Sequence, residues 1–73
     1  MRYLSAEKRL TDDFGDRFTM KVDEYVYDGA TYRGPWACMT HKSWKTHGCG
    51  VLGTGRGQKY QRNAEGHLIK VGG

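Results

Sequence analysis

The sequence predicts a small α+β fold, in which an antiparallel sheet of three to five strands carries one short helix. Three observations favour this fold class. The chain has 73 residues, of which 37% are hydrophobic, so residues 1–73 are expected to form one domain with a small core. Short runs of alternating apolar and polar residues are typical of strands. One segment, residues 40–47, has helix-capping residues at both ends.

Residues 1–13 are charged and weakly patterned, and two interpretations stay open for them. Tyr3, Leu4 and Leu10 can line one side of a short helical turn, or the segment is a flexible arm that becomes ordered on a partner. The residues that follow indicate a turn exposed to solvent, without the spacing or the closing glutamate of a calcium-binding loop: Asp12, Asp13, Gly15 and Asp16.

The strongest strand signal covers residues 18–27, where these apolar side chains alternate with polar ones: Phe18, Met20, Val22, Tyr25 and Tyr27. The alternation shifts at Asp23–Glu24, as a β-bulge would make it shift. Asp28-Gly29 then predicts a tight hairpin turn, because both residue types tolerate a positive φ. Residues 30–33 are expected to return as a second short strand, which ends at Gly34-Pro35 because proline cannot donate to a ladder.

The helix is predicted over residues 40–47. Thr40 is a suitable N-cap, and Gly48 stands where a left-handed C-cap is common. Eight residues are too few to be helical alone, so Trp44 is expected to hold the helix on the sheet. Trp36 is also expected in the core, because so small a domain has few other large apolar groups.

The last part of the chain predicts a loop and a terminal hairpin. Residues 48–57 contain five glycines, and they match a dinucleotide-binding pattern only by accident because no strand precedes them. Residues 52–59 form either a flexible connector or an anion-binding nest of backbone N–H groups. Residues 58–62 and 67–71 read as two strands joined across residues 63–66.

Four side chains that can bind zinc fall within twelve residues: Cys38, His41, His47 and Cys49. Their spacing differs from that of familiar zinc fingers. Three interpretations stay open: ordinary structural roles, a zinc site that supplements the small core, and a reversible disulfide between the two cysteines. We expect the structural roles, with no metal and no cofactor.

Charge is sorted along the chain. Residues 1–32 carry seven acidic and five basic side chains, a net charge of −2, whereas residues 33–73 carry seven basic side chains and one acidic, a net charge of +6. Such a field suits docking on a charged macromolecule. No catalytic constellation and no apolar run of membrane-spanning length is present. The sequence therefore predicts a binding protein rather than an enzyme.

Several short segments resemble small basic proteins of phages and prophages, in particular phage-encoded transcription regulators that bind bacterial RNA polymerase: Gly34-Pro35-Trp36-Ala37, Met39-Thr40, Ser43-Trp44, His47-Gly48, Leu52-Gly53-Thr54-Gly55 and Gly57-Gln58-Lys59-Tyr60. The resemblance implies a non-enzymatic protein of the host bacterial cytoplasm that needs no cofactor. It implies binding to RNA polymerase, inhibition of transcription initiation and promotion of antitermination.

The charge distribution leads to a hypothesis for the partner surface. We expect a monomer that contacts the polymerase, and nearby nucleic acid, through the N-terminal arm and a basic face: Tyr3, Leu4, Arg33, Lys42, Lys45, Arg56, Lys59 and Arg62. The acidic first third would meet a basic patch of the same partner. The alternative is a direct nucleic-acid-binding protein, whose glycine-rich basic face contacts phosphates and whose aromatic side chains stack on bases.

Overall fold

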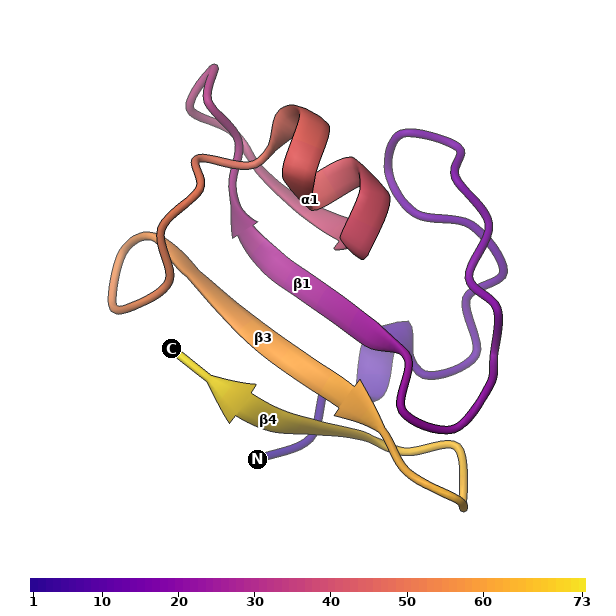
Figure 1. Ribbon diagram of the computed structural model, residues 1–73. Coiled ribbons are helices and arrows are strands. Elements are labelled where there is room, and N and C mark those ends of the chain that lie inside the picture. The colour runs from indigo at the N-terminus through magenta and orange to yellow at the C-terminus, as the bar shows by residue number, and fades with distance from the viewer.

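A computed structural model describes residues 1–73 as one four-stranded antiparallel sheet with one α-helix (Figure 1). The strand order is β2-β1-β3-β4. The elements are β1 (Tyr25–Ala30), β2 (Trp36–Thr40), α1 (His41–His47), β3 (Gly57–Arg62) and β4 (Leu68–Gly72), preceded by a 3₁₀ turn at Leu4–Ala6. The predicted α+β class is confirmed. No helix is long and apolar enough to cross a membrane.

The first strand begins later than predicted. A strand over residues 18–27 is wrong for most of its length, because only the last three of these residues belong to β1. The preceding segment bends instead: Met20 and Asp23 have positive φ values of 63° and 72°. The Glu24 carboxylate accepts hydrogen bonds from the backbone N–H groups of Thr19 and Met20 at 2.6 and 3.1 Å. The apolar alternation therefore lies in a loop closed around Glu24.

The hairpin turn predicted at Asp28-Gly29 is also wrong, because both residues lie inside β1. Gly29 is needed there for packing. A Cβ atom on Gly29 would lie 2.9 Å from Cζ3 of Trp44 and 3.0 Å from the Cα of Gly57. The turn instead spans 31–35, which replaces the short strand predicted at residues 30–33.

The predicted helix is confirmed, with one change at its end. Thr40 caps α1 by accepting a hydrogen bond from the backbone N–H of Ser43 at 3.1 Å. Gly48 is extended (φ −70°, ψ 161°) rather than left-handed. A side chain at Gly48 would overlap the ring of Trp44, so glycine is required here by packing. The terminal hairpin of β3 and β4 forms as predicted, with an irregular register between Lys59 and Tyr60.

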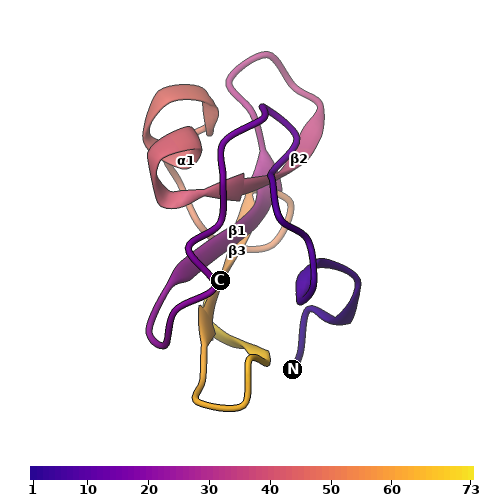
Figure 2. The same cartoon turned by 90° about the vertical axis from the view of Figure 1, so that its right-hand side faces the viewer.

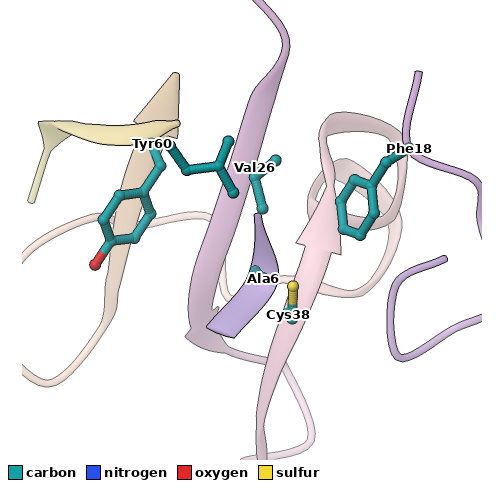
Figure 3. Packing of buried hydrophobic residues seen from close by; sticks show 6 residues of the cluster. Ala6, Phe18, Val26, Cys38 and Tyr60 are labelled. Atoms are coloured by element: carbon teal, nitrogen blue, oxygen red, sulfur yellow. The ribbon is translucent and has the colours of Figure 1, made fainter. Parts of the chain in front are cut away.

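Buried residues cover both faces of the sheet. On one face, the cluster drawn in Figure 3 packs the sheet against the N-terminal segment: Ala6, Phe18, Val26, Cys38, Tyr60 and Leu68. On the other face, α1 places Trp44 flat on Tyr27, with ring centroids 5.0 Å apart and an interplanar angle of 3°. Ala37 and Met39 complete this second cluster. The short helix is thus held by Trp44, as predicted.

The N-terminal segment, residues 1–18, forms a strap rather than a flexible arm. Its first part, with the 3₁₀ turn, lies on the face of the sheet opposite α1, and residues 12–16 then pass along the outer edge of β2 towards α1 (Figures 1 and 2). At one edge of the sheet, the carbonyl of Met1 accepts from the N–H of Lys70 at 2.8 Å, and the N–H of Tyr3 donates to the carbonyl of Leu68 at 2.9 Å. The predicted helical turn survives as the single 3₁₀ turn within this strap.

Candidate partner-binding surface

The acidic side chains of the first third are largely used inside the fold. Arg2 donates to both carboxylate oxygens of Glu7, at 2.7 and 3.1 Å, and the backbone N–H of Leu68 donates to one of them at 2.9 Å. The hydrogen bonds from Arg2 lower the pKa of Glu7 to about 2, against the opposing effect of burial. Glu7 therefore ties the strap to β4 and is not free for a partner.

Three further acids protect the outer edge of β2. Asp12 and Asp13 accept from the backbone N–H groups of Thr40 and Cys38, at 2.9 and 2.7 Å. Asp16 accepts from the Thr40 hydroxyl at 2.6 Å. The expected solvent-exposed turn is thus wrong for Asp12, which is 4% exposed. Burial raises its pKa, but hydrogen bonds from Ser43 and from backbone N–H groups outweigh burial and leave the pKa below its ordinary value.

Arg62 does not belong to the basic surface. Its side chain is 1% exposed, and its Nε donates to Oε1 of Glu24 at 3.0 Å. Its Nη1 donates to the carbonyls of Glu7 and Gly66, at 2.9 and 3.0 Å. The structure therefore corrects the prediction at this position: Arg62 joins β3 to the strap, and it cannot meet a partner.

Tyr3 and Leu4 also separate from the rest of the predicted surface. Tyr3 is half-buried and packs on the ring of Tyr60, 4.9 Å away, on the face opposite α1. Burial raises its pKa above the ordinary value. Leu4 is exposed on the 3₁₀ turn of the strap. The two arm residues accordingly do not continue the basic face.

The five remaining predicted cations are free of ion pairs, because the three salt bridges of the protein involve other residues. Lys42 and Lys45 are exposed on α1, and Lys59 extends from β3 on the same face of the sheet. Arg56 immediately precedes β3, and Arg33 lies in the β1–β2 turn. We call these five residues the cationic surface.

An aromatic cluster adjoins the cationic surface on the sheet. The Nζ of Lys59 lies 3.9 Å from the ring centroid of Tyr25, which is 37% exposed, and 5.8 Å from that of Tyr27. The hydroxyl of Tyr27 is 2.9 Å from Nδ1 of His41. This cation–π contact holds the Lys59 side chain close to the sheet. It also places a positive charge next to the partly exposed ring of Tyr25.

A second group of aromatic side chains lies at the surface. The prediction from the sequence that Trp36 belongs to the core is wrong. Trp36 is 48% exposed at the start of β2. It lines a hollow of about 200 Å³ together with Tyr32 and Arg33 of the β1–β2 turn, Phe14 of the strap and His47 of α1. We call this the aromatic hollow. No local pattern identifies it, because its walls come from three separate segments of the chain.

The four candidate zinc ligands do not converge. Cys38 faces the strap, whereas Cys49 packs beside the Trp44 cluster on the other face. His41 contacts Tyr27, and His47 stacks on Phe14. No group of three or more His, Cys, Asp or Glu side chains is placed to hold a metal ion, and both cysteines are free thiols.

The glycine-rich loop is closed on itself. The N–H groups of Gly53, Arg56 and Gly57 all donate to carbonyls within the loop, at 2.9 to 3.0 Å. Because these donors are already used, they cannot form the anion-binding nest that residues 52–59 suggested. The groups that remain for an anion are the exposed side chain of Arg56 and the backbone N–H groups of Thr54 and Gly55, which donate no hydrogen bond in the fold.

The chain matches no protein-family model, no curated protein and no solved structure.

Proposed function

We propose that this chain is a non-enzymatic regulator of transcription that binds bacterial RNA polymerase in the host cytoplasm. It would inhibit initiation and promote antitermination, as the resemblance to phage-encoded regulators implies. The observation that carries the binding role is the contrast between the two sets of charges. Most acids of the first third are engaged inside the fold, whereas five cations on and around the α1 side have no ionic partner.

This contrast favours an acidic partner surface. Charges that are already paired inside the fold contribute little to the field felt by an approaching molecule, whereas unpaired cations steer and orient one. Arg33, one of these cations, lines the aromatic hollow with the exposed Trp36 and Tyr32, and these three residue types are the commonest hot spots of protein–protein interfaces. A cationic surface with an adjacent aromatic hot spot therefore favours a protein partner.

The size of the molecule agrees with docking. A standard interface buries about 800 Å² on each partner. The chain exposes 4529 Å² in total, so such an interface would occupy roughly a fifth of its surface. A protein of this size can block or displace another factor on a large enzyme by occupying its site.

The test is a binding measurement with purified bacterial RNA polymerase holoenzyme. The variant Lys42→Glu/Lys45→Glu/Lys59→Glu reverses three charges of the cationic surface. The matched control Lys8→Glu/Arg17→Glu/Lys21→Glu reverses three exposed charges elsewhere, with the same change of net charge. We expect the first variant to bind at least tenfold more weakly and to lose transcription inhibition, while the control stays within about threefold of the wild type.

Two outcomes would overturn the proposal. The wild-type chain fails to bind the holoenzyme, or both charge-reversal variants lose affinity equally. The second result would mean that net charge, rather than a defined surface, governs the interaction.

A second candidate function is direct binding of single-stranded nucleic acid. It is favoured by Lys59 over the exposed ring of Tyr25, which puts a cation and a stacking surface in one place. Affinity for an oligonucleotide should then fall steeply with salt, by about one unit of log–log slope for each phosphate neutralised. Affinity for the polymerase that survives salt better than affinity for an oligonucleotide would favour the protein partner.

A further inference from the structure

We propose that the aromatic hollow is the anchor site of this interface. It would take one large apolar side chain, preferably aromatic, from a partner segment that carries carboxylates on either side of it. This inference rests on the proposed function in its choice of partner. The hollow itself can be tested without the polymerase.

The hollow is built by residues that are distant in sequence. Phe14 comes from the strap, Trp36 from the start of β2 and His47 from the end of α1, while Tyr32 and Pro35 belong to the β1–β2 turn. Its volume of about 200 Å³ is enough for one large side chain but not for a folded element. The side chains of Phe14, Trp36 and Tyr32 remain 44–62% exposed, although a chain this small has few other large apolar groups for its core.

The walls are fixed before any partner arrives. The ring of Phe14 stacks on that of His47, with centroids 4.0 Å apart and an interplanar angle of 10°. The N–H of Tyr32 donates to the carbonyl of His47 at 2.9 Å. Both the N–H and the hydroxyl of Thr31 donate to the carbonyl of Pro35, at 2.9 and 2.8 Å. A preformed pocket lowers the entropy cost of binding, which favours a specific anchor.

The chemistry of the walls favours a side chain over a nucleobase. A base that is read specifically needs hydrogen-bonding groups for its edges. Here the Thr31 hydroxyl is already used by Pro35 and the Tyr32 hydroxyl by Arg33, and Phe14, Pro35 and Ala37 offer only apolar surface. The polar groups that remain on the walls belong to Arg33, Trp36 and His47. An apolar side chain needs no hydrogen bond from these walls, and it gains free energy by burying apolar surface against them.

Charge selects the neighbours of the anchor. Arg33 lies at the hollow, its Nε donating to the hydroxyl of Tyr32 at 3.0 Å, and no acidic residue lines the site. The nearest acid in sequence, Asp13, is already bound by Arg9 at 3.0 Å and by the N–H of Cys38. Lys42 and Lys45 are exposed on α1, the helix that ends at the hollow with His47. A carboxylate beside the anchor would therefore meet the unpaired Arg33.

The experiment uses the full chain labelled with ¹⁵N and a short synthetic peptide, acetyl-Asp-Glu-Phe-Asp-Glu-amide. One matched peptide has alanine in place of phenylalanine, and another has lysine in place of every acid. We expect the first peptide to shift the indole N–H signal of Trp36 much more than that of the buried Trp44. The alanine peptide should bind about tenfold more weakly, and the lysine peptide should not bind measurably.

Variants of the chain locate the effect. Trp36→Ala is expected to lower the affinity for the phenylalanine peptide about tenfold. Leu10→Ala, which removes an exposed apolar side chain outside the hollow, should leave affinity unchanged. The Trp44 indole signal reports whether Trp36→Ala keeps its fold. If that variant unfolds, Arg33→Gln, an exposed substitution that leaves the aromatic walls in place, should still lower affinity for the acidic peptide.

Three results would overturn the inference. The phenylalanine and alanine peptides bind equally, Trp36→Ala and Leu10→Ala behave alike, or oligothymidylate shifts the Trp36 signal while the acidic peptide does not. The last result would assign the hollow to nucleic acid.

The polymerase assay separates this inference from the proposed function. If Trp36→Ala binds the holoenzyme as well as the wild type does, while the cationic-surface variant does not, the proposed function stands and the anchor site is wrong. If the peptide binds at Trp36 but the wild-type chain does not bind the holoenzyme, the anchor site stands and the partner is a different acidic protein.

Discussion

Arg62 and Glu24 form the one ion pair buried in this protein, with Nε and Oε1 3.0 Å apart and side chains 1% and 8% exposed. The pair joins the end of β3 to the loop before β1, and Arg62 Nη1 extends the link to the carbonyl of Glu7 in the strap. Three parts of the chain therefore meet at one guanidinium. Burying charges is costly in itself, so the arrangement stabilises the fold only while both partners are present.

Removing Arg62 alone should be severe. We expect Arg62→Ala to lower the free energy of unfolding by about 3–5 kcal/mol, because it leaves the Glu24 carboxylate buried without its partner. Urea unfolding at neutral pH measures this loss. The double variant Arg62→Met/Glu24→Leu should lose less stability than the sum of the losses in the single variants Arg62→Met and Glu24→Leu. A loss below about 1 kcal/mol for Arg62→Ala would contradict a structural role.

Gly29 should tolerate no larger residue while Trp44 is present. The missing Cβ leaves space for the Trp44 ring, so we expect Gly29→Ala to cost about 1–3 kcal/mol by overpacking. The same substitution in a Trp44→Leu background should cost less, because the smaller side chain frees the space. Equal costs in the two backgrounds, measured by urea unfolding, would show that Gly29 serves the backbone and not the ring.

Glu7 should make stability depend on acid pH. Its pKa falls from 4.5 to about 2 on folding, mainly through hydrogen bonds from Arg2, so the ionised carboxylate favours the folded state. This stabilisation is complete above the unfolded pKa and is lost as the pH falls through about 2. The stability difference between the wild type and Glu7→Gln should therefore shrink from pH 6 to pH 2.5. Glu65→Gln, which removes a carboxylate outside any ion pair, is the control.

Asp12 should protect the sheet from self-association. Asp12→Ala leaves the N–H of Thr40 without its acceptor, and we expect a cost of about 1–3 kcal/mol. The same change uncovers the edge of β2, and exposed strand edges pair with other chains. Light scattering at rising concentration should show association of Asp12→Ala but not of the wild type or of Glu65→Ala. An unchanged monomeric variant of wild-type stability would rule out this role.

The sequence predicted those elements whose signals are local. Thr40 caps α1 from the neighbouring position, and the turn between β3 and β4 lies between two short alternating runs. Gly29 and Arg62 were misread because their roles depend on Trp44 and Glu24, which lie 15 and 38 residues away. A glycine beside an aspartate is typical of a turn unless a distant ring needs its space.

The positions of the basic side chains were predicted in part for the same reason. Lys42, Lys45 and Lys59 share the α1 side of the sheet, as a basic face requires. The exposure of Trp36 could not be predicted from the sequence. A small domain is expected to bury both of its tryptophans, and only the tertiary structure shows that Trp44 is buried while Trp36 is exposed. The acids of the strap looked like solvated charges, since their acceptor role depends on the free edge of a strand 25 to 28 residues away.

The strap gives the protein an unusual order of events during synthesis. Residues 1–3 are synthesised before the backbone groups that they bind, on residues 68 and 70. The sheet edge that they close does not exist until residues 68 and 70 have been made, so these contacts cannot form earlier in synthesis. Closing so long a loop also predicts slower folding than the size alone would suggest. A fusion partner placed directly before Met1 would hinder the contacts of residues 1–3 with residues 68 and 70.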